Sequence, residues 1–356
     1  MQPQGKYRCL KCDGSSFSAS STVWVCGRCG EKYACVHGMP KLYFDDRIGP
    51  QDRKLRDKFY DGVFGAFYAF MMPFIVLPVR PLAAAWLHWV LYLGTLGVLI
   101  FLAALAVWAG AAGHAIVAVL AVSLVGGCIG FLLRQKYLLD LLLLAIPTKF
   151  SLTRSRFTPT ETFAAVHQRA IESIGARDER LRILDVSTGS CNSLYKHGWM
   201  SLNAGYTAID LSQTMLSRGQ DLMAKRGIPI DLLLGDALDL PFQSDTFDVV
   251  LNYGAVNGTT DPRKALAEMT RVAKPGALLL FLDEQMYANA SRIERSYFHK
   301  VLSSHNVIHH CPVELLPADL EDVRVAQVYE FYYICTARKR AMPTGGSPTA
   351  IDAAHA

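Results

Sequence analysis

One run of residues constrains this chain more than any other feature, because no Asp, Glu, Lys or Arg occurs between Pro81 and Leu133. At about 1.5 Å per helical residue the run is ~80 Å long, enough to cross a hydrocarbon core of ~30 Å twice. Small residues at 110–113 favour a turn in its middle. The sequence therefore predicts transmembrane helices near residues 82–108 and 114–133, with two buried helices of a globular core as the alternative.

Basic residues on both sides of this run set the expected orientation. Arg80 precedes it, Arg134 and Lys136 follow it, and the turn is uncharged. The positive-inside rule then places both flanks in the cytoplasm, and the polar N-terminal segment gives no sign of a secretory leader. We therefore expect a multi-pass protein of the cell membrane with both termini cytoplasmic. The apolar but interrupted residues 59–79 and 137–147 are expected either on the membrane surface or in a lid.

The composition excludes several classes of protein. The 356 residues are 51% hydrophobic and 19% charged, which excludes a disordered or fibrous chain. The net charge of +5 is modest. Because proteins that bind nucleic acid usually carry a basic patch with interleaved aromatic residues, no nucleic-acid partner is expected.

Two Cys-x-x-Cys pairs lie near the N-terminus, Cys9 with Cys12 and Cys26 with Cys29. Two such pairs are typical of a tetrahedral structural zinc site. The segment is too short for a core of its own, so a bound metal would supply its folding free energy. A redox dithiol or a pair of disulfides is the alternative, although a cytoplasmic location disfavours stable disulfides.

From Leu181 onward, short apolar runs alternate with helical stretches. This alternation predicts parallel strands in a doubly wound sheet, with a ligand at the carboxyl ends of the strands. The last two runs have no long helix between them, which indicates an antiparallel hairpin at one edge. The expected strands are residues 182–186, 206–209, 230–233, 247–251, 277–281, 324–328 and 331–337.

Three places at the ends of these strands carry the expected chemistry. The first strand runs into a turn of small residues, 187–193, where a backbone can approach a ligand closely. Asp210 ends the next strand, where it can accept hydrogen bonds from a ribose. Asp236 follows the third strand and can accept a hydrogen bond from an adenine amino group. These positions predict a ligand that contains a nucleoside.

Together with residues 235–242, 247–251 and 271–276, these motifs resemble the class I S-adenosylmethionine-dependent methyltransferases over about residues 160–340. Residues 253–257 and 265–269 are most similar to the ubiquinone/menaquinone C-methyltransferase type. The resemblance implies a seven-stranded, mostly parallel α/β sheet and S-adenosylmethionine as cofactor. Ser187 and Cys191 stand where that family usually has glycine. The cofactor-binding residues that it implies are Asp185, Ser187, Gly189, Cys191, Asp210, Leu211, Asp236, Ala237 and Asn252.

Residues 7–43 resemble the zinc ribbon of the small methyltransferase-activator family, through the second cysteine pair, Lys32-Tyr33 and residues 37–42. That ribbon often precedes methyltransferase domains, and it contacts partners and does no chemistry. The resemblance implies zinc on Cys9, Cys12, Cys26 and Cys29, and a protein partner. Phe59-Tyr60-Asp61 resembles the leader of such methyltransferases, so the predicted hairpin would interrupt their N-terminal cap.

The sequence does not name the methyl acceptor or the catalytic base. Methyl transfer is an in-line displacement in which the protein mainly aligns the reactants, often with one base nearby. We expect a lipophilic acceptor, such as a quinone, terpenoid, polyketide or lipid, at the cytoplasmic face. A membrane-protein acceptor recruited by the ribbon, or a non-catalytic membrane-tethered adaptor, are the alternatives. The candidate bases are Glu284, Tyr287, His305, His309 and His310.

These features divide the chain into six expected segments. The lead-in and the cap helices belong to the expected N-terminal cap of the methyltransferase, and the hairpin lies between them. The last segment is an expected disordered tail rich in Ala, Pro, Gly and Thr. The expected segments are the zinc ribbon 1–45, an amphipathic lead-in 46–80, the transmembrane hairpin 81–134, a linker with cap helices 135–180, the methyltransferase domain 181–340 and the tail 341–356.

Overall fold

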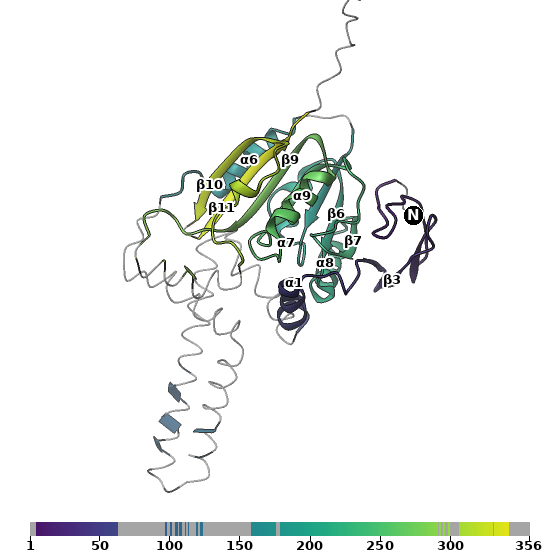
Figure 1. The fold of residues 1–356 in the computed structure, drawn as a ribbon. Coiled ribbons are helices and arrows are strands. Elements are labelled where there is room, and N and C mark those ends of the chain that lie inside the picture. The colour runs from purple at the N-terminus through teal and green to yellow at the C-terminus, as the bar shows by residue number, and fades with distance from the viewer. Residues whose placement is uncertain are drawn as a thin grey trace, which may run out of the picture.

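The computed structural model describes residues 5–62, 158–175, 179–290, 306–329 and 331–341, with isolated positions between 97 and 123 and between 292 and 299 (Figure 1). Strands and helices alternate through the C-terminal half, as expected. The strands are β1 (Phe17–Ala19), β2 (Val23–Cys26), β3 (Lys32–Val36), β4 (Met39–Leu42), β5 (Leu181–Val186), β6 (Ala204–Asp210), β7 (Ile230–Gly235), β8 (Phe247–Tyr253), β9 (Ala273–Glu284), β10 (Leu320–Tyr329) and β11 (Tyr332–Lys339). The helices are α1 (Pro50–Leu55), η1 (Arg56–Tyr60), α6 (Phe163–Glu172), α7 (Asn192–Lys196), η2 (Trp199–Ser201), α8 (Gln213–Lys225), α9 (Pro262–Val272) and η4 (Val313–Leu315).

The seven C-terminal strands form the expected doubly wound sheet, in the order β7-β6-β5-β8-β9-β11-β10. The first five are parallel, and β11 lies antiparallel between β9 and β10. After β5 the chain forms β6 and β7 on one side of β5 in the sheet, and then β8 on its other side. The point between β5 and β8 is therefore the topological switch point, where such sheets bind their ligands. The predicted parallel sheet and its antiparallel edge hairpin are confirmed.

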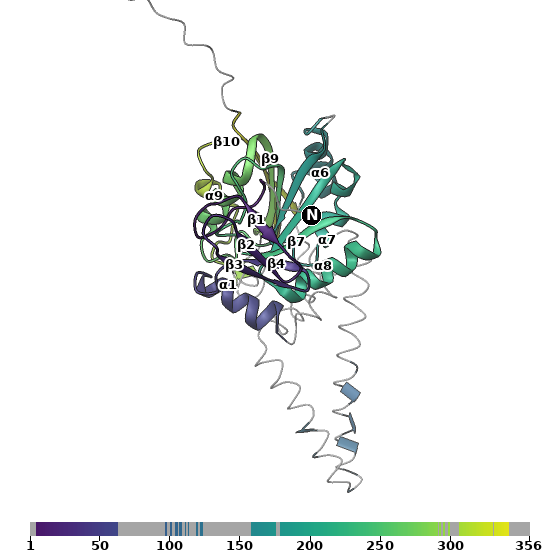
Figure 2. The same cartoon turned by 90° about the vertical axis from the view of Figure 1, so that its right-hand side faces the viewer.

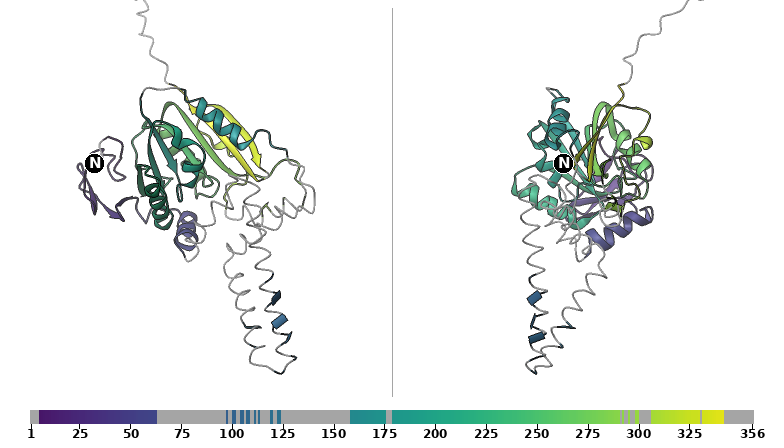
Figure 3. Two further views of the ribbon diagram at one scale, coloured as in Figure 1. Left: turned by 180° about the vertical axis from the view of Figure 1, so that it is seen from behind. Right: turned by 90° about the vertical axis from the view of Figure 1, so that its left-hand side faces the viewer.

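Helices cover both faces of this sheet (Figure 3). Helix α9 buries Leu266 and Met269 in the larger core on one face, and α6 buries Val166 and Ala170 in a second core on the other. Side-chain caps begin these helices: the Asp261 carboxylate, for example, accepts a hydrogen bond from the Lys264 amide at the start of α9. Such caps satisfy amides that have no partner within the helix.

The four N-terminal strands continue the same sheet, which the sequence did not predict (Figure 2). They are paired antiparallel among themselves. Strand β4 then pairs parallel with β7, with Lys41 opposite Leu234 and Leu42 opposite Gly235. The resulting sheet has eleven strands. The cysteine-bearing segment thus covers the edge of the sheet that would otherwise expose unpaired backbone groups.

Side chains reinforce this junction. The Arg8 guanidinium donates to the Asp239 carboxylate at 2.6 Å and to the Leu240 carbonyl at 3.0 Å. The Tyr7 ring packs between Trp24 and Phe242, with ring centroids 5.0 and 5.7 Å away. The N-terminal segment therefore shares the core of the larger domain.

The predicted membrane localisation requires a correction. The part of the chain that the structure describes contains no helix with the length and apolarity to span a bilayer. An uncharged run establishes apolarity, but a span also needs a continuous helix of ~20 residues. This finding contradicts the prediction of a multi-pass membrane protein with cytoplasmic termini. The predicted hairpin 81–134, the segment 137–147 and the tail lie mostly outside the described residues.

Candidate functional site

The carboxyl ends of four parallel strands bring most of the predicted cofactor residues to one edge of the sheet. Asp185 lies opposite Ala208 of β6 and Leu251 of β8. Asp210 lies opposite Leu234 of β7, one residue before that strand ends. The register therefore aligns the ends of β5, β6, β7 and β8 at the switch point.

The fully buried side chain of Asp185 stabilises the turn after β5. The Thr188 hydroxyl donates to Asp185 Oδ2 at 2.6 Å. Asp185 Oδ1 is also buried and has no hydrogen-bond partner. An orphaned buried carboxylate oxygen is costly, so this atom fits a site that a ligand or water completes.

Three alternate residues of this turn have left-handed backbone conformations: φ is +55° at Ser187, +57° at Gly189 and +57° at Cys191. Side chains disfavour this conformation by roughly 1–2 kcal/mol each, which explains why the family uses glycine at these positions. Ser187 and Cys191 therefore adopt, with side chains, a conformation that glycine adopts readily. A Cβ atom at Gly189 would approach Met215 Cε to 3.2 Å, so the middle glycine has little room for replacement.

We expect Ser187→Gly to stabilise the protein by ~1 kcal/mol, because relief of the left-handed strain exceeds the entropic cost of glycine. Chemical denaturation of the variant and the parent measures this difference. Ser217→Gly, inside α8, is the matched control and should lower stability by roughly 0.5–1 kcal/mol. Equal losses in both variants would contradict a strained turn.

Asp210 connects this turn to the next helix. Its Oδ2 accepts a hydrogen bond from the Gly189 amide and its Oδ1 one from the Ser212 amide, both at 2.8 Å. Each oxygen retains capacity for a second donor, and the side chain keeps some accessible surface. Asp210 can therefore fix the turn and accept ligand hydroxyl groups at once.

The other predicted cofactor residues lie around the same edge. Asp236 follows β7, and its Oδ1 accepts a hydrogen bond from the Leu238 amide at 2.9 Å. Asn252 is buried and ties β8 to β5 by donating to the Val186 carbonyl at 3.1 Å. Leu211 is half-buried after β6, and Ala237 is buried after Asp236.

A segment that the sequence analysis did not include among the site residues lies over this edge. The Thr260 amide donates to the carboxylate of Asp52 in α1 at 3.1 Å. At the other end of the segment, Asp61 Oδ1 accepts hydrogen bonds from the Ser212 hydroxyl at 2.6 Å and the Thr214 amide at 3.0 Å. Residues 50–61 thus bridge the loops that follow β6 and β8. The leader motif ending at Asp61 was the only sequence signal for this bridge.

Burial raises the pKa of three carboxyl groups at this edge. It raises the pKa of Asp210 to about 6 and that of Asp236 to about 6. The pKa of Asp185 is about 7, because burial and the charge of Asp210 outweigh the hydrogen bond from Thr188. Clustered carboxyl groups with raised pKa values are typical of functional sites.

We expect affinity for S-adenosylmethionine to fall as the pH drops through about 6. Only the ionised forms of Asp210 and Asp236 accept hydrogen bonds at full strength, and their raised pKa values place their protonation near pH 6 instead of ~3.9. Calorimetric titration from about pH 5 to about pH 8 measures the trend. A flat affinity over that range would contradict a role for these carboxylates.

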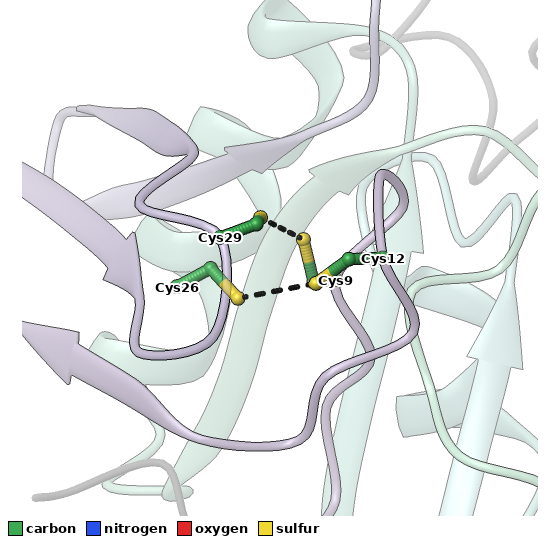
Figure 4. A group of neighbouring side chains, drawn as sticks. All are labelled: Cys9, Cys12, Cys26 and Cys29. Atoms are coloured by element: carbon green, nitrogen blue, oxygen red, sulfur yellow. Dashed lines mark hydrogen bonds between the residues drawn. The ribbon is translucent and has the colours of Figure 1, made fainter.

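The four predicted metal ligands converge (Figure 4). All their sulfur atoms lie within 4.8 Å of one another, with 3.6 Å between Cys9 and Cys29 and 3.7 Å between Cys12 and Cys26. Four sulfurs at ~2.3 Å from one zinc ion would be ~3.8 Å apart, whereas a disulfide needs ~2.05 Å. The cysteines are free thiols, and their spacing fits a single tetrahedral ion.

The predicted catalytic candidates differ in burial and in their partners. Tyr287 is buried at 6% exposure, His309 has a buried Nδ1 without a hydrogen-bond partner, and His310 forms an exposed ion pair with Glu314. His305 lies outside the described residues. The loop that carries His309 and His310 is bound to the segments that follow β8 and β9, because the Val307 amide donates to the Asn257 carbonyl and the Cys311 amide donates to the Gln285 side chain. Two histidines outside the predicted set, His167 and His197, pack against Tyr253, the last residue of β8.

Comparison with known proteins agrees with this geometry. The methyltransferase-domain family model matches residues 184–281. A demethylmenaquinone methyltransferase of Renibacterium salmoninarum is 36% identical over 110 residues, which are 31% of this chain and 44% of that protein. A ubiquinone/menaquinone biosynthesis C-methyltransferase of Marinomonas sp. is 35% identical over 104 residues, 28% of this chain and 41% of that protein. The chain thus spans less than half the length of these two relatives.

Solved structures give weaker likenesses. A putative methyltransferase of Bacillus halodurans aligns with a TM-score of 0.41 at 17% identity, over 50% of this chain and 100% of that one. The [4+2]-cyclase SpnF aligns with a TM-score of 0.41 at 16% identity, over 52% of this chain and 86% of that one. These scores are too low to establish a relationship, so the family match and the curated relatives decide the assignment. Over residues 184–281 the chain matches the methyltransferase-domain family, which supports the S-adenosylmethionine-dependent methyltransferase that the sequence motifs resemble.

Proposed function

We propose that the chain transfers a methyl group from S-adenosylmethionine to a lipophilic small molecule of the quinone class. The observation that carries the cofactor assignment is the alignment of Asp185, Asp210 and Asp236 at the ends of successive parallel strands. The two relatives are named for the methylation of demethylmenaquinone and for ubiquinone and menaquinone biosynthesis, which supports the acceptor class.

The residues present fit this cofactor. The turn at residues 187–191 offers a close backbone approach, Asp210 offers acceptors for ribose hydroxyls, and Asp236 offers one for an adenine amino group. The bound cofactor supplies the methyl group and a thioether leaving group. The chain itself holds the reactants in line and excludes water, which is the main protein contribution to such a displacement.

We also propose that Cys9, Cys12, Cys26 and Cys29 bind one structural zinc ion. Their sulfur separations support a tetrahedral site, and the Tyr33 hydroxyl lies 3.3 Å from the Cys9 sulfur, where it can donate to a metal-bound thiolate. Such hydrogen bonds to ligands tune and orient metal sites. The zinc-bearing segment then acts on the enzyme through β4, which pairs with the strand that leads to Asp236.

Methyl transfer to a defined probe tests the proposal. We expect the purified chain to move label from methyl-labelled S-adenosylmethionine into reduced demethylmenaquinone with a short prenyl chain, measured in an organic extract. Label in co-incubated protein instead would favour a protein acceptor recruited by the N-terminal segment. Failure to bind the cofactor would favour a non-catalytic adaptor.

A further inference from the structure

Two successive carboxyl groups end strand β9, and they have different surroundings. Asp283 is buried at 2% exposure. Its oxygens accept hydrogen bonds from the backbone amides of Asn257 and Glu284, both at 2.8 Å. Because neighbouring residues of a strand point to opposite faces, Glu284 points away from this network. Asp283 therefore serves the fold, and Glu284 remains available.

One of the two carboxylate oxygens of Glu284 accepts a hydrogen bond that fixes the side chain. Asn306 Nδ2 donates to Glu284 Oε2 at 2.8 Å, and Asn257 Nδ2 donates to the Glu284 carbonyl at 2.9 Å. The Val307 amide in turn donates to the Asn257 carbonyl at 2.7 Å, which fixes the loop that carries Asn306. Within the described part of the chain, no residue donates a hydrogen bond to Glu284 Oε1, and the side chain is only partly buried. The carboxyl is thus fixed in place through Oε2, while Oε1 accepts no hydrogen bond from the described residues.

Strand β9, which carries Glu284, lies on the side of the switch point away from the predicted cofactor carboxylates. The cofactor carboxylates end or follow β5, β6 and β7, whereas β9 lies beyond β8 on the opposite side. An acceptor in line with the methyl group must approach from the side away from the sulfur, so it needs room beside β8 and β9. Among the candidate bases in the described residues, Glu284 is the one fixed at the carboxyl end of a strand there.

Its environment also suits a proton acceptor. Burial, followed by the charge of Asp283, raises the pKa of Glu284 to about 8, and the hydrogen bond from Asn306 opposes this shift only partly. Tyr332, opposite Glu284 on β11, and its neighbour Tyr333 are titratable groups that the charge of Glu284 reaches, and the pKa values of both lie well above 10. A base whose pKa lies near the working pH combines ionisation with a useful affinity for protons.

We propose that Glu284 is the catalytic base, and that it takes a proton from a hydroquinone-class acceptor while that acceptor is methylated. This inference rests on the proposed function. The acceptor's ring carbon forms the bond to the methyl group, the methyl–sulfur bond breaks, and its electron pair stays on sulfur. The proton that the acceptor loses passes to Glu284 Oε1, and no oxidant or reductant is consumed.

Glu284→Gln tests this role with reduced short-chain demethylmenaquinone as the probe. We expect kcat to fall by roughly 10²–10⁴-fold, the usual contribution of a general base, with little change in affinity for S-adenosylmethionine. In the parent, kcat should rise as the pH increases through about 8, and the variant should lose this rise. Glu284→Asp should recover part of the rate. Glu314→Gln, an exposed carboxylate paired with His310, is the matched control and should keep parental kinetics.

An infrared difference spectrum gives a second, rate-independent measurement. The parent minus the Glu284→Gln variant should show a protonated carboxyl band that disappears as the pH rises through about 8. A variant that keeps kcat within about threefold of the parent would overturn the role, since general bases contribute far more. A parent that binds S-adenosylmethionine but methylates no hydroquinone probe would overturn the acceptor class. A parent that does not bind S-adenosylmethionine would instead overturn the proposed function itself.

Discussion

Replacement of Asp210 by alanine is expected to weaken S-adenosylmethionine binding about ten- to a hundredfold. The variant loses acceptors for the ribose hydroxyls, at ~1.5–3 kcal/mol for hydrogen bonds to a charged group, and each 1.4 kcal/mol is about tenfold in affinity. It also releases the Gly189 and Ser212 amides that this carboxylate holds at 2.8 Å. The turn after β5 should therefore lose its shape as well as a contact.

Calorimetric titration of the variant beside the parent measures this effect. Asp221→Ala, which removes an exposed carboxylate from α8, is the matched control and should bind like the parent. Asp210→Asn keeps the side-chain size and removes the charge, so its affinity for S-adenosylmethionine should lie between those of Asp210→Ala and the parent. Equal affinities for the alanine variant and the parent would mean that the cofactor does not use the end of β6.

Loss of the metal is expected to unfold the N-terminal segment and to weaken cofactor binding as well. Structural zinc supplies ~10–16 kcal/mol of apparent binding free energy to small modules that lack a core. The Cys26→Ser, Cys29→Ser double variant should therefore lose its zinc and its protection from hydrogen exchange in residues 7–42. Because Leu42 pairs with Gly235, directly before Asp236, the third strand of the cofactor site should also become less ordered.

Elemental analysis measures the zinc content, hydrogen exchange measures the order of residues 7–42, and calorimetric titration measures cofactor binding. Cys35→Ser, which changes a cysteine outside the group of four, should leave all three unchanged. Strands β5 and β8 should remain protected in the double variant, because they lie inside the sheet. Unchanged zinc content in the double variant would rule out the four-cysteine site.

The parallel sheet could be predicted from the sequence because its signals are local. Apolar runs such as residues 247–251 fixed the strands, and the absence of a long helix before residue 331 predicted the edge hairpin. The positions of Asp210 and Asp236 at strand ends could be predicted in the same way, and their cofactor role stays a prediction. The cysteine group followed from spacing alone, since each pair brings two sulfurs together within one turn.

The remaining features depend on contacts between residues far apart in the chain. Nothing near Leu42 indicates that it pairs with Gly235. The leader motif that ends at Asp61 does not indicate which loops, more than a hundred residues away, Asp52 and Asp61 hold. Glu284 could be named as one of several bases, but only its hydrogen bond to Asn306 separates it from the histidines. The membrane prediction rested on apolarity alone, and the described residues contain no helix with the length and apolarity to span a bilayer.

Titration of the parent chain with S-adenosylmethionine in a calorimeter tests the central claim most directly. The arrangement of Asp185, Asp210 and Asp236 predicts one site per chain with a dissociation constant on the order of micromolar, about −8 kcal/mol, at a pH above the pKa values of these groups. S-adenosylhomocysteine should compete for the same site. No heat of binding from a folded, zinc-loaded chain would contradict the assignment of these strand ends to S-adenosylmethionine, and with it the proposed methyl transfer.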